Sequence, residues 1–71
     1  MLNPAIQCAN ELAKAEFSKE MLDKLVRESL KKLAVFGTLG WVRQELFAAF
    51  EALDLQSDQA AYIRTAIVRL S

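Results

Sequence analysis

Residues 18–37 read SKEMLDKLVRESLKKLAVFG, and this stretch decides the fold class. Apolar side chains recur in it every three or four residues, which is the pattern of the buried face of an amphipathic α-helix. With a turn of about 100° per residue, they share one arc of about 140°. The members of this arc are Leu22, Leu25, Val26, Ser29, Leu30, Leu33 and Phe36. We therefore predict one helix here, with a core side and a solvent side.

The opposite face of this predicted helix is charged and contains oppositely charged residues four positions apart. The pairs are Glu20–Lys24, Asp23–Arg27 and Glu28–Lys32. Pairs with this spacing stabilise a helix by about 0.2–0.5 kcal/mol each. We interpret the charged run as a solvated face rather than as a binding site.

Capping signals place a first helix before this one. Asn3 followed by Pro4 is typical of a helix start, and this helix is expected to reach about residue 16. Ser18 is the expected N-cap of the second helix, flanked by Phe17 and Leu22 as a hydrophobic staple. One continuous, kinked helix across both segments is the alternative.

Two further helices follow. The second helix is expected to end at Gly37 in the left-handed conformation that glycine favours after a helix. The third begins within residues 38–40 and reaches about residue 53. Ser57 caps the fourth, and Asp58 lies in its first turn. Because the connections are short, we predict an all-α bundle of about four antiparallel helices that forms a single domain over residues 1–71.

The later helices also show apolar stripes. The expected core positions are Leu39, Val42, Leu46, Ala49, Phe50 and Leu53 in the third helix, and Ala60, Ile63, Ala66, Ile67 and Leu70 in the fourth. Leu33 and Leu46 lie mid-stripe and should be central. The first helix has only a narrow polar strip and many small residues, so we expect neighbours on two sides of it. Cys8 is interpreted as a small buried apolar residue.

Composition argues against several functional classes. The 71 residues include nine basic and nine acidic side chains, one cysteine and no histidine. No disulfide can form within the chain, no metal or cofactor site is predicted, and an enzyme is not expected. The absence of a basic excess argues against a nucleic-acid partner. No segment is apolar enough for a membrane span, and residues 1–13 lack the pattern of a signal peptide, so we expect a cytoplasmic protein.

Large aromatic side chains lie off the predicted stripes, and they suggest a contact surface. Trp41 and Phe47 point away from the core positions of the third helix, and Tyr62 lies to one side of the fourth. Trp, Tyr and Arg often anchor protein interfaces. The candidate partner-binding residues are Trp41, Arg43, Phe47, Glu51, Tyr62, Arg64 and Val68. The alternative is that steeply crossed helices bury the off-stripe rings within the core.

These patterns predict a non-catalytic protein–protein interaction module. A small regulator or inhibitor, an antitoxin-like partner and a secretion-type chaperone all fit, acting as a homodimer or in a hetero-complex. The alternative is a dimeric helix-turn-helix regulator that binds DNA. Residues 30–47, LKKLAVFGTLGWVRQELF, place a glycine-containing turn between two helices, and Thr38, Arg43 and Gln44 would face the groove of the DNA.

Overall fold

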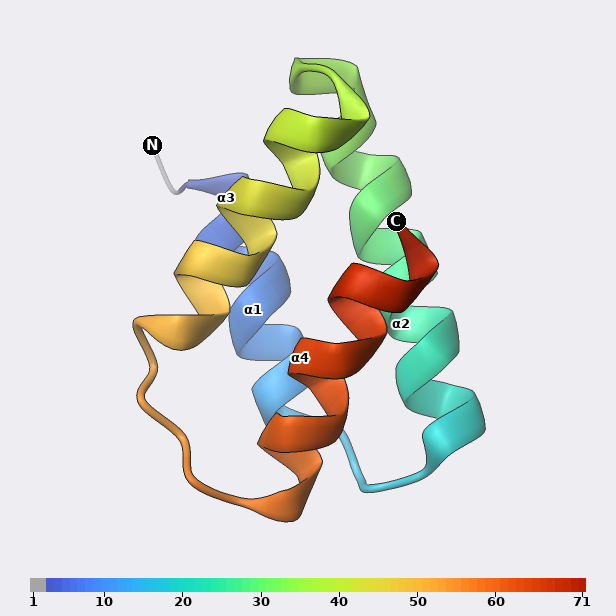
Figure 1. Cartoon of the computed structure of the whole chain (residues 1–71), viewed down its shortest axis with the longest axis vertical. Helices are drawn as coiled ribbons and strands as arrows, with labels where there is room; N and C mark the ends of the chain where they lie inside the picture. Colours follow the sequence, from blue (N-terminus) through green and yellow to red (C-terminus); the bar gives the residue numbers. More distant parts are fainter. Residues whose placement is uncertain (1–2) are drawn as a thin grey trace.

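The computed structural model describes residues 3–71, which form four α-helices and one short 3₁₀ helix around one hydrophobic core. The elements are α1 (Pro4–Lys14), α2 (Lys19–Leu33), η1 (Ala34–Phe36), α3 (Leu39–Glu51) and α4 (Asp58–Leu70). The all-α prediction is confirmed. Helix α1 packs mainly against α3, and α2 mainly against α4, so the four helices surround a common centre (Figure 1). Within residues 3–71, no helix has both the length and the apolar character needed to cross a membrane.

Each α-helix begins with a side-chain cap, and for three of the four the sequence indicates the capping residue. Asn3 Oδ1 accepts hydrogen bonds from the backbone N–H groups of Ala5 at 2.8 Å and Ile6 at 3.4 Å. The equivalent caps of α2, α3 and α4 are Ser18, Thr38 and Ser57. Since α1 ends at residue 14 and α2 begins at residue 19, the two are separate helices, and a continuous kinked helix is excluded.

The exit from α2 differs from the prediction. The helix ends at Leu33, and the chain tightens into η1 before it reaches Gly37. Gly37 has φ 176° and ψ −170°, which is extended rather than left-handed. Glycine is required at this position for a steric reason, because a Cβ at residue 37 would lie 2.8 Å from Trp41 Cε3. Glycine here lets the indole ring pack directly on the backbone.

The buried core follows the predicted stripes except at their ends near η1. Leu33 and Leu46 are almost completely buried, as predicted, and Cys8 is buried beside them in the core. Phe36 and Leu39 were expected in the core, yet 59% and 57% of their surfaces are exposed. A 3₁₀ helix turns about 20° more per residue than an α-helix, which swings Phe36 off the stripe. Leu39 lies in the first turn of α3 and faces solvent.

The end of α3 also departs from the prediction, because the helix stops two residues early, at Glu51. Asp54 has a φ of 50°, in the left-handed region where a right-handed helix cannot continue. The backbone N–H of Asp54 donates to Glu51 O at 3.0 Å and closes the last turn. The chain then crosses to Ser57 and the start of α4.

The contact ion pairs among residues 3–71 join different helices, and none forms between the predicted partners within α2. Alongside the hydrogen bond from Tyr62, the charge of Arg27 nevertheless lowers the pKa of Asp23, as the i, i+4 spacing predicts. Asp23 Oδ1 accepts from Arg69 Nη2 of α4 at 2.8 Å, and Lys32 Nζ lies 3.9 Å from Glu11 Oε2 of α1. Neighbouring helices supply the contact partners of Asp23 and Lys32, whereas Glu20, Lys24 and Glu28 form no ion pair within residues 3–71.

Candidate interaction surface

The outer faces of α3 and α4 enclose a groove. Two shallow hollows meet there, with volumes of about 330 Å³ and 420 Å³. Phe47 of α3 and Val68 of α4 line both hollows, so the two form one continuous surface. We call it the α3–α4 groove. Its lining residues are Arg43, Gln44, Phe47, Ala48, Arg64, Thr65, Val68 and Arg69.

The floor of the groove is apolar. Val68 exposes 55% of its surface, and this exposed part faces the groove. Phe47 is partly buried and packs against the core cluster, while the rest of its surface faces the groove. Neither sequence-based alternative for Phe47 holds alone, because the ring belongs to both the core and the surface.

Three arginines edge this floor, and two of them are already paired. Arg64 Nε donates to Glu51 Oε1, and Arg69 Nη2 donates to Asp23 Oδ1. Arg43 lies at the other end of the groove and forms no ion pair with any residue in 3–71. The guanidinium of Arg43 therefore offers a fork of donors at the edge of the apolar floor.

Arg64 is held in place by contacts on several sides. Its Nη2 donates to the carbonyl oxygen of Leu55 at 2.5 Å, and its guanidinium lies 5.9 Å from the centre of the Phe50 ring. These contacts join α4 to the α3–α4 connection. They fix the position of one edge of the groove.

Tyr62 lies outside the groove, between α2 and α4. Its hydroxyl donates to Asp23 Oδ1 at 2.7 Å, and Arg69 Nη2 lies 3.2 Å from the hydroxyl oxygen. The ring also lies 6.1 Å from that of Phe17, and Lys19 Nζ lies 5.7 Å from its centre. These contacts engage Tyr62 within the chain, and its partner-binding role stays a prediction.

The hydrogen bond between Asp23 and Tyr62 shifts both ionisations. It is the largest cause that lowers the pKa of Asp23 below its usual value, and the charge of Arg69 lowers this pKa further. The same hydrogen bond raises the pKa of Tyr62, because losing the phenolic proton would place two negative charges together. The contact between α2 and α4 is thus tied to an ionised Asp23 and a neutral Tyr62, and Arg69 links it to the groove edge.

Trp41 is also outside the groove, at the opposite flank of α3. It lines a hollow of about 370 Å³ with Phe36, Glu45 and the start of α1. Its ring rests on Gly37 and exposes 43% of the residue surface. Of the seven predicted contact residues, the structure brings Arg43, Phe47, Arg64 and Val68 together, with Glu51 bound to Arg64 at the edge.

Four groove residues were not among the predicted partner-binding residues, and of these only Gln44 was named at all, as a DNA contact in the alternative function. They are Gln44, Ala48, Thr65 and Arg69. Helical spacing contains part of the signal, since Gln44 is three positions before Phe47, and Thr65 is three before Val68. That spacing identifies a face of each helix. It does not show that these faces of α3 and α4 adjoin.

The positions of the possible metal-ligating side chains give no candidate metal site in the part of the chain that the structure describes. Within residues 3–71, no group of three or more His, Cys, Asp or Glu side chains is placed to hold a metal ion. Comparison with protein-family models, with curated proteins and with solved structures finds no match to this chain.

Proposed function

We propose that this protein is a non-catalytic interaction module whose α3–α4 groove binds a helix of another protein. The observation that supports this most is the apolar floor of Phe47 and Val68 between arginine side chains. A partner helix that inserts one or two apolar side chains would bury this floor. An amphipathic helix laid in a groove is a recurring mode of peptide recognition.

The charge of the groove specifies the partner further. All three ionisable side chains among the lining residues of the two hollows are arginines. Arginine binds carboxylates through two parallel N–H···O bonds, which fixes orientation as well as adding affinity. The partner helix is therefore expected to carry Asp or Glu beside its apolar side chains. Arg43 would be the first to bind, since Arg64 and Arg69 must share or exchange their present carboxylates.

A groove of this kind suits a small regulator or inhibitor, an antitoxin-like partner or a chaperone. We propose a function within this group of non-catalytic binding proteins. Regulators and inhibitors act by occupying a surface, which needs a preformed apolar site and no reacting group. A cytoplasmic location is part of the proposal. The single thiol, Cys8, is buried in the core and needs no oxidising compartment.

Charge substitutions on α4 test this function. The probe is a short synthetic amphipathic helix with leucines on one face and glutamates beside them. Val68→Glu should weaken binding of this peptide by about tenfold or more, because it adds a negative charge to the apolar floor. Ala61→Glu is the matched control. Ala61 is exposed on the same helix, two turns earlier, and lines neither hollow.

The outcomes separate binding from folding. Thermal melting should show both variants folded, and Ala61→Glu should bind like the parent. A peptide with lysines in place of glutamates should bind more weakly, since it meets Arg43 with like charge. Equal affinity of Val68→Glu and Ala61→Glu for the acidic peptide would overturn the assignment of the groove.

DNA binding is less well supported. In a helix-turn-helix, α3 would be the recognition helix, and Arg43 is its only basic residue. Its first turns expose Leu39 and Trp41, while Glu45 and Glu51 would repel phosphates. A strongly salt-dependent electrophoretic shift with duplex DNA would favour this alternative over the protein-binding function.

A further inference from the structure

A second exposed apolar surface lies where α2 passes through η1 into α3. Four large side chains are open to solvent there: Val35 by 80%, Phe36 by 59%, Leu39 by 57% and Trp41 by 43%. We call these four residues the apolar corner. It lies at the end of the bundle opposite the α3–α4 connection (Figure 1), and none of its residues lines the α3–α4 groove. The two surfaces are therefore separate.

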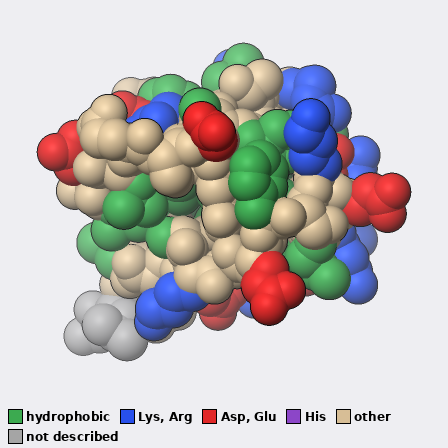
Figure 2. All heavy atoms as spheres, turned by 90° about the horizontal axis from the view of Figure 1, so that it is seen from below, with side chains coloured by type: hydrophobic (Ala, Val, Ile, Leu, Met, Phe, Trp, Pro, Cys, Tyr) green, Lys and Arg blue, Asp and Glu red, His purple; other side chains and the backbone are tan. Residues whose placement is uncertain are grey.

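The size of the corner limits what it can bind. Side chains of this kind carry on the order of 150–250 Å² each, so these exposures leave roughly 500 Å² of apolar surface. That is as large as the largest apolar patch on a typical monomer, and such patches are often functional. The opposite end of the bundle looks different. There, hydrophobic areas are interrupted by Lys, Arg, Asp and Glu (Figure 2).

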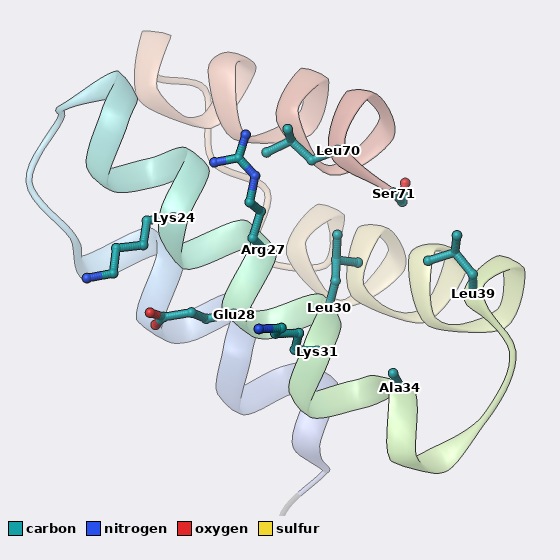
Figure 3. A pocket seen from close by; sticks show the side chains of 9 residues that line it. All are labelled: Lys24, Arg27, Glu28, Leu30, Lys31, Ala34, Leu39, Leu70 and Ser71. Carbon is teal, nitrogen blue, oxygen red and sulfur yellow. The ribbon is translucent and has the colours of Figure 1, made fainter.

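One flank of the corner is hollow. A depression of about 480 Å³ lies there between α2, η1, α3 and the end of α4 (Figure 3). Its apolar lining is Leu30, Ala34, Leu39 and Leu70, and its polar lining is Lys24, Arg27, Glu28, Lys31 and Ser71. Lys31 stands at its edge on α2. The nearest carboxylate in its lining is Glu28, one turn back along the same helix. Lys31 has no ion pair with any residue in 3–71.

The other flank carries the exposed side chains of Phe36 and Trp41. Glu45 lies beside them, in the lining of the separate hollow of about 370 Å³. Glu45 likewise has no ion pair within residues 3–71. The corner therefore has the rings of Phe36 and Trp41 and the carboxylate of Glu45 on one flank, and a hollow with the ammonium group of Lys31 on the other.

We propose that the apolar corner binds the apolar corner of a second copy of this chain around a two-fold axis. Such an axis, placed between the two flanks, sets each flank against the opposite flank of the other copy. Phe36 of each copy would enter the hollow beside Leu39 of the other. Lys31 of each copy would face Glu45 of the other. The two-fold axis would therefore create two Lys31–Glu45 ion pairs across the interface.

Charge and area both fit this occupant. The formal net charge is zero, so two copies do not repel each other at long range. Pairing two corners would bury about 1,000 Å², the lower limit for a specific interface. The dimer should therefore be weak, with a dissociation constant on the order of 0.1 mM. A dimer of this kind would leave both α3–α4 grooves free.

Charge exchange at Lys31 and Glu45 tests the pairing in the full chain. Sedimentation equilibrium between about 10 μM and 1 mM should show a monomer–dimer equilibrium for the parent. Lys31→Glu and Glu45→Lys should each weaken self-association by about tenfold, because each places like charges across the interface. An equimolar mixture of these two variants should associate like the parent, since the mixed dimer restores both opposite-charge contacts. Val68→Glu, a groove variant, should self-associate like the parent.

Trp41 gives an independent readout, because it is the only tryptophan and lies in the corner. Its emission should shift to shorter wavelength as the parent is concentrated, and Phe36→Asp should abolish the shift. A parent that stays monomeric throughout overturns the proposal, and so does a variant mixture that fails to associate. A blue shift produced only by vesicles of anionic phospholipid also overturns it, in favour of a membrane surface as the occupant.

Discussion

Phe47 and Phe50 are the same residue type, three positions apart on α3, and differ in what surrounds them. Phe50 is completely buried, whereas Phe47 is partly buried with one side in the groove. Phe50→Ala should therefore cost about 3–5 kcal/mol of unfolding free energy. Phe47→Ala removes a ring with fewer core contacts and should cost about 1–3 kcal/mol. The total stability of a 71-residue domain is only about 4–10 kcal/mol, so the two variants should differ clearly.

Urea unfolding followed by circular dichroism measures both values, and thermal melting checks them. A loss of 1 kcal/mol lowers Tm by about 4–8 °C in a domain of this size. Phe50→Ala should thus melt at least about 12 °C below the parent, and Phe47→Ala should lie between the two. Equal losses for both variants would refute the reasoning, because Phe47 would then be an ordinary core residue. Phe47→Leu, which keeps most of the apolar contact, should recover most of the stability.

Two further predictions concern the contact between α2 and α4 at Tyr62 and the packing of Trp41 on Gly37. Tyr62→Phe should lower Tm at neutral pH, and its difference from the parent should shrink on acidification toward about pH 2, measured by melting against pH. The folded pKa of Asp23 is lowered, so its stabilising effect is present above its unfolded pKa and is lost as pH falls through the folded one. Gly37→Ala should displace the Trp41 ring and shift its emission to longer wavelength. Gly40→Ala, with no atom within 4 Å of the added Cβ, should leave the emission unchanged and stabilise α3 by about 0.5 kcal/mol.

The parts of the fold that were predicted correctly depend on local chemistry. Asn3, Ser18 and Ser57 cap the helices that the sequence assigns to them, because a cap needs only the backbone of the next turn. The buried faces of α2 and α4 follow from helical periodicity in the same way. Leu33 and Leu46 are almost completely buried, as their places on the predicted apolar faces indicate, although Leu33 is the last residue of α2.

The incorrect predictions depend on contacts between distant segments. The conformation of Gly37 is set by packing against Trp41, and a glycine after a helix is equally compatible with the left-handed cap that was expected. Asp23 pairs with Arg69 because α2 lies against α4, which no spacing within α2 reveals.

The same limit applies to the candidate surface. Spacing identified Phe47 and Val68 as off-stripe positions on two different helices. Only the packing of α3 beside α4 makes them neighbours in one groove, and it also separates Trp41 and Tyr62 from that groove. The division of the predicted set into two surfaces is therefore a result of tertiary structure.

The most direct test of the groove is a map of where the acidic amphipathic peptide binds. Titration into the isotope-labelled protein, followed by backbone amide NMR shifts, reports every segment at once. The account predicts that the largest shifts fall in residues 43–48 of α3 and 64–69 of α4, and that they are lost in Val68→Glu. Shifts centred instead on the apolar corner or on the outer face of α1 and α2, or no saturable shifts at all, would contradict it.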